Sequence, residues 1–142
     1  DPRRLPGEVI KVADMGLKAG VLKASDPFLA DAMAQAKGRI AADKASLPGL
    51  DREARAGKDG KTAMAMADAY LSYDEAAKAE EMYKMAIAKG NVDKDRAYTR
   101  LGIAQIDLDK FEEAKASFAQ VGGVRAPLAK LWSAFAATQA RP

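Results

Sequence analysis

The sequence contains no cysteine and no histidine, and each absence excludes a class of chemistry. Without cysteine there can be no disulfide, no thiolate nucleophile and no zinc site of the usual Cys/His kind. Without histidine the chain lacks the side chain that most often acts as a general base near neutral pH. No nucleophile–base pair, metal-ligand cluster or glycine fingerprint stands out in their place. We therefore predict a protein that is not an enzyme and that binds no metal and no cofactor.

Long apolar runs and clusters of one charge are missing as well. No apolar run approaches the roughly 20 residues that a membrane-spanning helix needs. The 23 basic and 20 acidic residues are interleaved, whereas a nucleic-acid-binding protein usually concentrates Lys and Arg on one face. The sequence opens without a starting methionine or a signal peptide, on Asp1-Pro2-Arg3-Arg4, which we interpret as a cut edge. We expect neither a membrane span nor a nucleic-acid partner, and the location stays open between cytoplasm and periplasm.

Alanine dominates the apolar residues, which make up 49% of the chain, while aromatic residues are only 6%. Alanine is the best helix former, and its small side chain lets neighbouring helices approach closely. The core must then come from many close helix contacts and a few large anchors. This composition predicts an all-α protein, and its alanine-rich style suggests a bacterial source.

Two helices are predicted in the first part of the chain. They cover about residues 6–23 and 27–46, and Asp26 followed by proline is typical of the start of the second helix. Leu47-Pro48-Gly49 is expected to end that helix, because proline has no N–H for the next helical hydrogen bond.

From residue 61 onward the helix signals become regular. Helices are expected near residues 61–72, 74–89, 93–107, 109–120 and 127–139. Asp74, Asp93 and Asp109 stand where N-caps belong, and Gly90 and Gly122-Gly123 stand where helices should end. No stretch alternates β-branched and polar residues as a strand does.

The second half of the chain repeats itself at an interval of 35 residues. The matching pairs are residues 66–70 with 101–105, Asp74 with Asp109, Ala79 with Ala114, and Tyr83 with Phe118. A further step of 34 residues takes Tyr98, Leu101 and Gly102 to Trp132, Phe135 and Ala136. Small residues such as Ala67 and Gly102 stand where paired helices should cross. The large buried anchors are expected to be Tyr83, Phe118, Trp132 and Phe135.

This pattern resembles the tetratricopeptide repeat, a helix–turn–helix unit that reads W-x2-L-G-x2-Y, then A-x3-F, then a proline. Leu101-Gly102 matches the L-G step, Ala114 with Phe118 matches A-x3-F, and Trp132 falls at the tryptophan. The sequence departs from the pattern at Gln105, where the family has tyrosine. The resemblance implies an α-α superhelix, which is a right-handed array of antiparallel helix pairs.

Three parts of the chain follow from these patterns. Residues 60–142 are expected to form two tetratricopeptide-like repeats and a trailing helix. Residues 47–59 are expected to form a connecting loop with a short helix. Residues 1–46 are expected to form an N-terminal helical pair, which is either a degenerate repeat or a separate packing partner.

Two further motifs have plain structural interpretations. Residues 57–62 superficially resemble a phosphate-binding loop, but Arg55 stands where that motif needs glycine, and no strand precedes it. The acidic pairs Glu80-Glu81 and Glu112-Glu113 are interpreted as solvated helix faces, with lysines nearby to form weak charge pairs.

In the family that the chain resembles, the first helix of each unit lines a concave groove that receives an extended peptide or a helix. The corresponding residues here are Lys61, Met64, Asp68, Leu71, Arg96, Thr99, Arg100, Ile103 and Ile106. Arg96 and Arg100 are four apart, so they lean toward one spot and are expected to orient the partner. They resemble half of the carboxylate clamp of chaperone-binding members. Because Met64 and Asp68 replace its other half, we do not expect a chaperone-tail function.

Two alternatives concern this predicted groove. Its apolar residues are either open to a partner or covered by the chain's own N-terminal helices or by the trailing helix. Asp93 and Asp95 lie close enough in sequence to neutralise the two arginines, which would then have a structural role.

The resulting hypothesis is a non-catalytic scaffold that binds a peptide or a helix of a partner protein. One alternative is a homo-oligomeric assembly module, in which the exposed terminal helix around Trp132 and Phe135 joins two copies. Another alternative is the regulatory repeat region of a larger protein.

Overall fold

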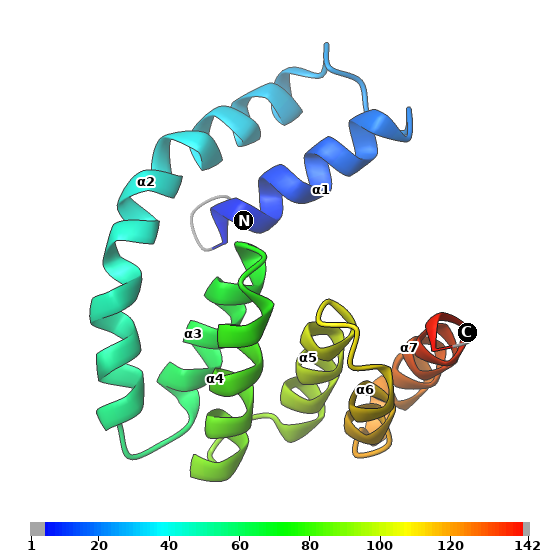
Figure 1. Cartoon of the computed structure of the whole chain (residues 1–142). Coiled ribbons are helices and arrows are strands. Elements are labelled where there is room, and N and C mark those ends of the chain that lie inside the picture. Colours follow the sequence, from blue (N-terminus) through cyan, green and yellow to red (C-terminus); the bar gives the residue numbers. More distant parts are fainter. Residues whose placement is uncertain (1–4, 141–142) are drawn as a thin grey trace. The chain divides into compact units, whose positions relative to one another are not determined.

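The computed structural model of the protein describes residues 5–140 (Figure 1). The helices are α1 Pro6–Lys18, α2 Pro27–Ala56, α3 Lys61–Ser72, α4 Ala76–Lys89, α5 Lys94–Ile106, α6 Phe111–Phe118, the 3-10 helix η1 Gly123–Arg125, and α7 Ala126–Gln139. No strand occurs within the described range, which confirms the predicted all-α class. None of its helices has the length and apolar character that crossing a membrane requires. The interpretation of residues 1–4 as a cut edge falls outside the described residues.

The chain divides into two compact units, Asp1–Gly49 (unit 1) and Leu50–Pro142 (unit 2), and the boundary falls inside α2. The prediction that Pro48 ends this helix is wrong, since α2 continues through it to Ala56. A proline inside a helix costs about 3 kcal/mol, because it removes one hydrogen bond and crowds the preceding turn. Helix-forming residues on both sides and contacts at the end of α2 offset this cost. The predicted connection over residues 47–59 is therefore helical except at its end.

The last turn of α2 belongs to unit 2 and is held by the side chain of Lys89, at the end of α4. Lys89 Nζ donates hydrogen bonds to the backbone carbonyls of Ala54, Arg55 and Gly57, at 2.7, 2.7 and 2.6 Å. A helix end leaves its last carbonyls without partners, and a cation there also complements the helix dipole. The ammonium group therefore stabilises the continuation of α2 beyond Pro48.

Gly60, at the start of α3, lies too close to the end of α4 for any side chain. Its N–H donates to the carbonyl of Gly90 at 2.9 Å. A Cβ atom at Gly60 would stand 2.2 Å from the carbonyl oxygen of Ala86. Because that oxygen belongs to the backbone, no change of rotamer would relieve the clash, and the position requires glycine.

Within unit 2 each helix from α3 to α7 packs against the next one, and α3 also contacts α5 while α5 contacts α7 (Figure 1). The small residues predicted at the helix crossings, Ala67, Ala79, Gly102 and Ala114, are all buried. A Cβ atom on Gly102 would lie 2.5 Å from the ring of Phe118. The absence of a side chain at this position thus allows α5 and α6 to pack at their observed distance.

The turns after α3 and α5 have the same backbone geometry, 35 residues apart. Asp74 and Asp109 both adopt the left-handed conformation, with φ of 59° and 58°. The N–H of each donates to the carbonyl three residues earlier, at 3.2 and 2.9 Å. The next N–H donates to the carbonyl five residues earlier, at 3.0 and 2.8 Å. These bonds end a helix as a Schellman motif does, with aspartate at the left-handed position where glycine is more usual.

Two of the three predicted N-caps are therefore wrong. Asp74 and Asp109 end the preceding helix, and the N-caps of α4 and α6 are Glu75 and Lys110. The third is confirmed, because the Asp93 side chain accepts a hydrogen bond from the N–H of Arg96 at 3.0 Å. Aspartate suits both positions, since its short side chain caps helices and also tolerates the left-handed conformation.

Candidate functional site

The two arginines of the predicted groove converge on Asp68, a buried carboxylate of α3. Arg100 Nε donates to Asp68 Oδ1 at 3.0 Å, and Arg96 Nη2 donates to Asp68 Oδ2. The Tyr83 hydroxyl of α4 donates to Asp68 Oδ1 at 2.6 Å. Burial and the adjacent Asp68 charge raise the pKa of Tyr83 well above its usual value, so the phenol stays protonated. The predicted convergence is present, and the carboxylate that the arginines bind is the chain's own.

The other proposed neutralising groups, Asp93 and Asp95, have partners at the helix ends. Asp93 caps α5, and its carboxylate also lies 3.9 Å from the guanidinium of Arg125. Asp95 Oδ1 accepts a hydrogen bond from the N–H of Gly122 at 2.9 Å.

The apolar members of the predicted groove lie mostly in the interior of the protein. Met64, Leu71 and the polar Thr99 are buried, whereas Lys61 is exposed. The half-buried side chains of the other two, Ile103 and Ile106, pack against a cluster formed by Ala114, Phe118, Val121 and Ala129. The apolar residues of the predicted groove thus contribute to the packing of the helices. Binding of a partner on this face stays a prediction.

A second buried carboxylate, Glu80, connects three helices of unit 2. Lys110 Nζ and Lys84 Nζ each lie 2.7 Å from its carboxylate, and Gln105 Nε2 donates to it at 3.2 Å. The Ser117 hydroxyl of α6 donates to Gln105 Oε1 at 2.7 Å. Burial alone would raise the pKa of Glu80, but the hydrogen bonds from Lys110, Lys84 and Gln105 outweigh it and lower the pKa to about 2.

The interpretation of Glu80 as part of a solvated face is therefore wrong, because its neighbours supply the donors that a buried carboxylate needs. The sequence signal for this buried network was Gln105, since an amide replaces tyrosine in an otherwise apolar stripe.

Tyr70, the equivalent of Gln105 35 residues earlier, also bonds to a carboxylate. The Tyr70 hydroxyl donates to Asp51 Oδ2 at 2.7 Å, and burial together with this bond raises the pKa of Tyr70 to about 12.

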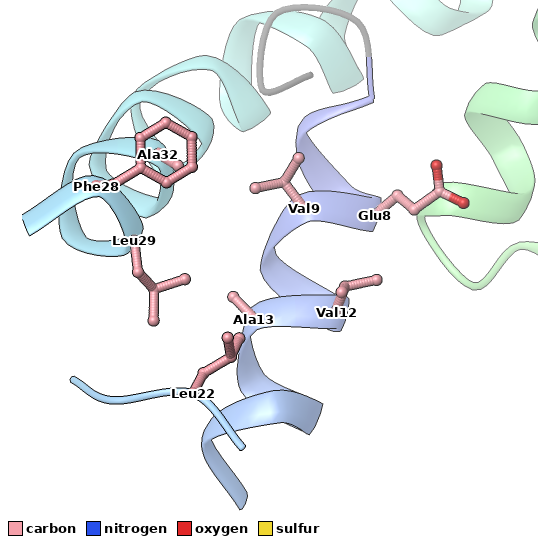
Figure 2. Close-up of a pocket in the computed structure, with 8 residues that line it drawn as sticks. All are labelled: Glu8, Val9, Val12, Ala13, Leu22, Phe28, Leu29 and Ala32. Carbon is pink, nitrogen blue, oxygen red and sulfur yellow. The ribbon is translucent and has the colours of Figure 1, made fainter. Parts of the chain in front are cut away.

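Unit 1 contains an apolar pocket between α1 and the beginning of α2 (Figure 2). Its volume is about 490 Å³, and its lining residues are Glu8, Val9, Val12, Ala13, Leu22, Phe28, Leu29 and Ala32. Phe28 and Val12 are 82% and 59% exposed, which is unusual for large apolar side chains. Figure 2 shows the carboxylate of Glu8 directed away from the apolar side chains that α2 contributes.

The sequence contained two signals for this pocket. Val9, Val12 and Ala13 have the spacing of one apolar helix face, and Phe28 follows the first-turn proline of α2. The Asp26 carboxylate caps that turn, as predicted, by accepting hydrogen bonds from the N–H groups of Phe28 and Leu29 at 2.8 and 3.3 Å. The cap fixes the backbone of the turn that carries Phe28, one of the residues that line the pocket.

A second exposed apolar surface lies on α7. Its inner side packs on α6, where Trp132 stacks against Phe118 with ring centroids 6.4 Å apart. On its outer side Leu131 is 70% exposed and Phe135 is 45% exposed. The prediction of Phe135 as a buried anchor is therefore wrong, because no later helix in the described range covers it.

Within residues 5–140 no group of three or more acidic side chains is arranged to hold a metal ion. Comparison with known proteins found no matching family model, no matching curated protein and no matching solved structure. The functional assignment therefore depends on the geometry of these surfaces.

Proposed function

We propose that the chain is a non-catalytic protein-interaction module that binds an amphipathic helix of another protein in the pocket of unit 1. The observation that carries this proposal is Phe28, whose side chain is 82% exposed beside an apolar pocket of about 490 Å³. Burying such a side chain contributes about 1.5–3 kcal/mol relative to leaving it in water.

The chemistry of the lining favours a protein ligand over a small polar molecule. Small-molecule sites usually combine an apolar wall with several convergent polar groups that orient the ligand. Here Val9, Val12, Leu22 and Leu29 form an aliphatic surface, and the carboxylate of Glu8 is at the edge. A helix presents apolar side chains at i, i+3, i+4 and i+7, which suits a surface formed by two helices.

A tetratricopeptide-like arrangement of unit 2 is part of the proposal. It is supported by the identical turns at Asp74 and Asp109, by the buried small residues of α3 to α6, and by the contacts of α3 with α5 and of α5 with α7. In this view α3 to α6 form a rigid frame, and Arg96 and Arg100 stabilise it through their hydrogen bonds to Asp68.

The test is a display selection of helical peptides against the whole chain, with counter-selection against Phe28→Asp. We expect enriched peptides with apolar residues at helical spacing, and at least tenfold weaker binding to Phe28→Asp, equivalent to about 1.4 kcal/mol. The matched control is Val21→Asp, since Val21 is 76% exposed but does not line the pocket. This control should bind as the parent does, and circular dichroism should show equal helicity for all three proteins.

Two outcomes would contradict the proposal. The enriched peptides could bind Phe28→Asp as well as they bind the parent. Alternatively, their binding could be lost with Arg100→Ala and Ile103→Asp while the helicity is retained, in which case the predicted groove of unit 2 is the binding site.

A further inference from the structure

Between Ser46 and Gly49 the helix α2 combines three features that weaken a helix. The Ser46 hydroxyl donates to the carbonyl of Asp43 at 2.7 Å, and such local bonds compete with the helical hydrogen bonds. Pro48 has no N–H to donate to the carbonyl of Lys44, and its ring crowds the preceding turn. Gly49, the next residue, is a poor helix former. Sharp bends of long helices occur mainly at residues of these kinds.

Close packing does not account for the glycine at this place. A Cβ atom at Gly49 would meet no neighbour within 4 Å, whereas one at Gly60 would stand 2.2 Å from a backbone oxygen. Pro48 is exposed, and among residues 37–49 of α2 the only buried side chain is that of Leu47. Few side-chain contacts therefore constrain the direction of α2 in this segment.

The last turns of α2, in contrast, are fixed on α3 and α4. The Tyr70 hydroxyl of α3 donates to Asp51 at 2.7 Å, and Arg55 Nη1 donates to Glu81 of α4 at 2.6 Å. Arg55 also pairs with Asp51, so one guanidinium group joins the two contacts. Lys89 of α4 holds the carbonyls at the end of the same turn. These bonds fix the direction of α2 immediately after its weakened segment.

The boundary between the two compact units falls directly after Gly49, where the weakened segment meets the fixed turns. Hinges are formed by a few residues that absorb the change in backbone angles while the elements on both sides stay intact. We propose that residues 46–49 form a hinge, at which the part of α2 in unit 1 changes direction relative to the last turns held on α3 and α4. This inference goes beyond the proposed function, because it requires no partner in the pocket of unit 1.

The test measures distances between two spin labels in the whole chain by pulsed electron paramagnetic resonance. The chain has no cysteine, so the labels attach only to introduced ones. In the first pair, Lys37→Cys with Lys94→Cys, the labels lie on opposite sides of the hinge, and in the second, Arg52→Cys with Lys94→Cys, both follow it; all three side chains are exposed. Lys37 precedes Pro48 by a length of helix of about 16 Å. We expect the distance distribution of the first pair to be at least twice as wide as that of the second.

Substitutions in α2 show whether these residues cause the width. Pro48→Ala combined with Gly49→Ala restores the missing N–H and introduces two good helix formers. This double variant should narrow the first distribution to the width of the second, and circular dichroism should show at least the helicity of the parent. Ser46→Ala alone should narrow it less. The matched control is Gly38→Ala, which replaces another glycine of α2 with open space around it and should leave the width unchanged.

Several results would overturn the hinge. Equal widths for the two pairs in the parent would show that α2 holds a single direction. A width that the double variant does not reduce, or that Gly38→Ala reduces as much, would place the bending elsewhere in α2. A broad distribution for the second pair would show that the last turns of α2 are not fixed on α3 and α4. No peptide is present in these measurements, so the hinge and the pocket of unit 1 are tested separately.

Discussion

The helices α3 to α6 and unit 1 use the same alanine-rich composition in different ways. In α3 to α6 the interior holds aromatic anchors over small residues, and it also holds two carboxylates with complete sets of donors. The buried side chains among the described residues of unit 1 are few, namely Pro6, Ala13, Ala36 and Leu47, and two of them are alanines. Several of its large apolar side chains remain at the surface, and Phe28 is the most exposed of them.

This difference indicates a division of roles. A buried carboxylate with several donors demands a specific arrangement of its helices, because breaking one contact leaves a charge without compensation. The networks around Asp68 and Glu80 therefore define a single packing for α3 to α6. None of the described carboxylates of unit 1 is buried, and under the proposed function a partner that covers its exposed apolar pocket would stabilise it.

Gly102→Glu should have the largest effect, since it disrupts the packing of α5 on α6. A Cβ atom there already lies 2.5 Å from the Phe118 ring, and the added carboxylate would be buried without a partner. We expect a loss of more than about 4 kcal/mol in the free energy of unfolding, measured by urea denaturation followed by circular dichroism. Ala79→Glu should act in the same way.

The matched control for this prediction is Gly38→Glu in α2, where a Cβ atom would meet no neighbour within 4 Å. It should change the free energy of unfolding by less than about 1 kcal/mol. If Gly102→Glu unfolds at the same urea concentration as this control, the packing of α5 on Phe118 is not as described.

Asp68→Asn should have the second largest effect, because it leaves two arginines without their carboxylate. Breaking a buried ion pair costs about 3–5 kcal/mol, and we expect the lower end because Arg96 is half exposed. Thermal and urea unfolding at neutral pH measure this loss. Glu53→Gln, which changes an exposed carboxylate of α2, should leave the midpoint unchanged. A similar midpoint for both variants would show that the Asp68 cluster does not stabilise unit 2.

Glu80 predicts a specific pH dependence of stability. Its pKa is about 2 in the folded protein and about 4.5 in the unfolded chain, so its contribution is present above pH 4.5 and is lost as the pH falls toward 2. The difference corresponds to up to about 3 kcal/mol. Urea unfolding at a series of pH values should show a shallower acid loss for Glu80→Gln than for the parent. Parallel profiles for the two proteins would contradict the assignment.

The smallest expected effect is a gain. Gly38 lies inside α2 in unit 1 with open space around it, so Gly38→Ala should stabilise the helix by about 0.5–1 kcal/mol. The equivalent change at Gly60 in unit 2 should destabilise the protein, because its Cβ atom would meet the backbone of α4. Thermal melts of the two alanine variants compare the units directly, and shifts in the same direction would refute the proposed difference in packing.

Sequence patterns located the second half of the fold well. The helix α3 begins and ends where the sequence predicted, and the small residues predicted at the helix crossings are buried. These features depend on local spacing and on residue size, which a sequence states directly. Pro48 misled the prediction because the bonds from Lys89 that hold the end of α2 come from a distant part of the chain.

The candidate sites were harder to predict, because they depend on which surfaces remain uncovered. The spacing of Arg96 and Arg100 showed that they converge, but it could not show that Asp68 would already occupy the point between them. Similarly, helical periodicity identifies an apolar face on α1 without showing that Phe28 stays exposed beside it. Only the packing of the helices decides which apolar residues form the core and which form a surface.

Hydrogen–deuterium exchange of the whole chain, with and without a display-selected peptide, tests most directly whether the binding site in unit 1 is separate from the framework formed by α3 to α6. The proposed function predicts that the peptide slows exchange in α1 and in residues 27–32, while exchange in α3 to α6 is the same with and without the peptide. New protection confined to α3 and α5, with none in α1, would contradict it and would return the binding site to the predicted groove.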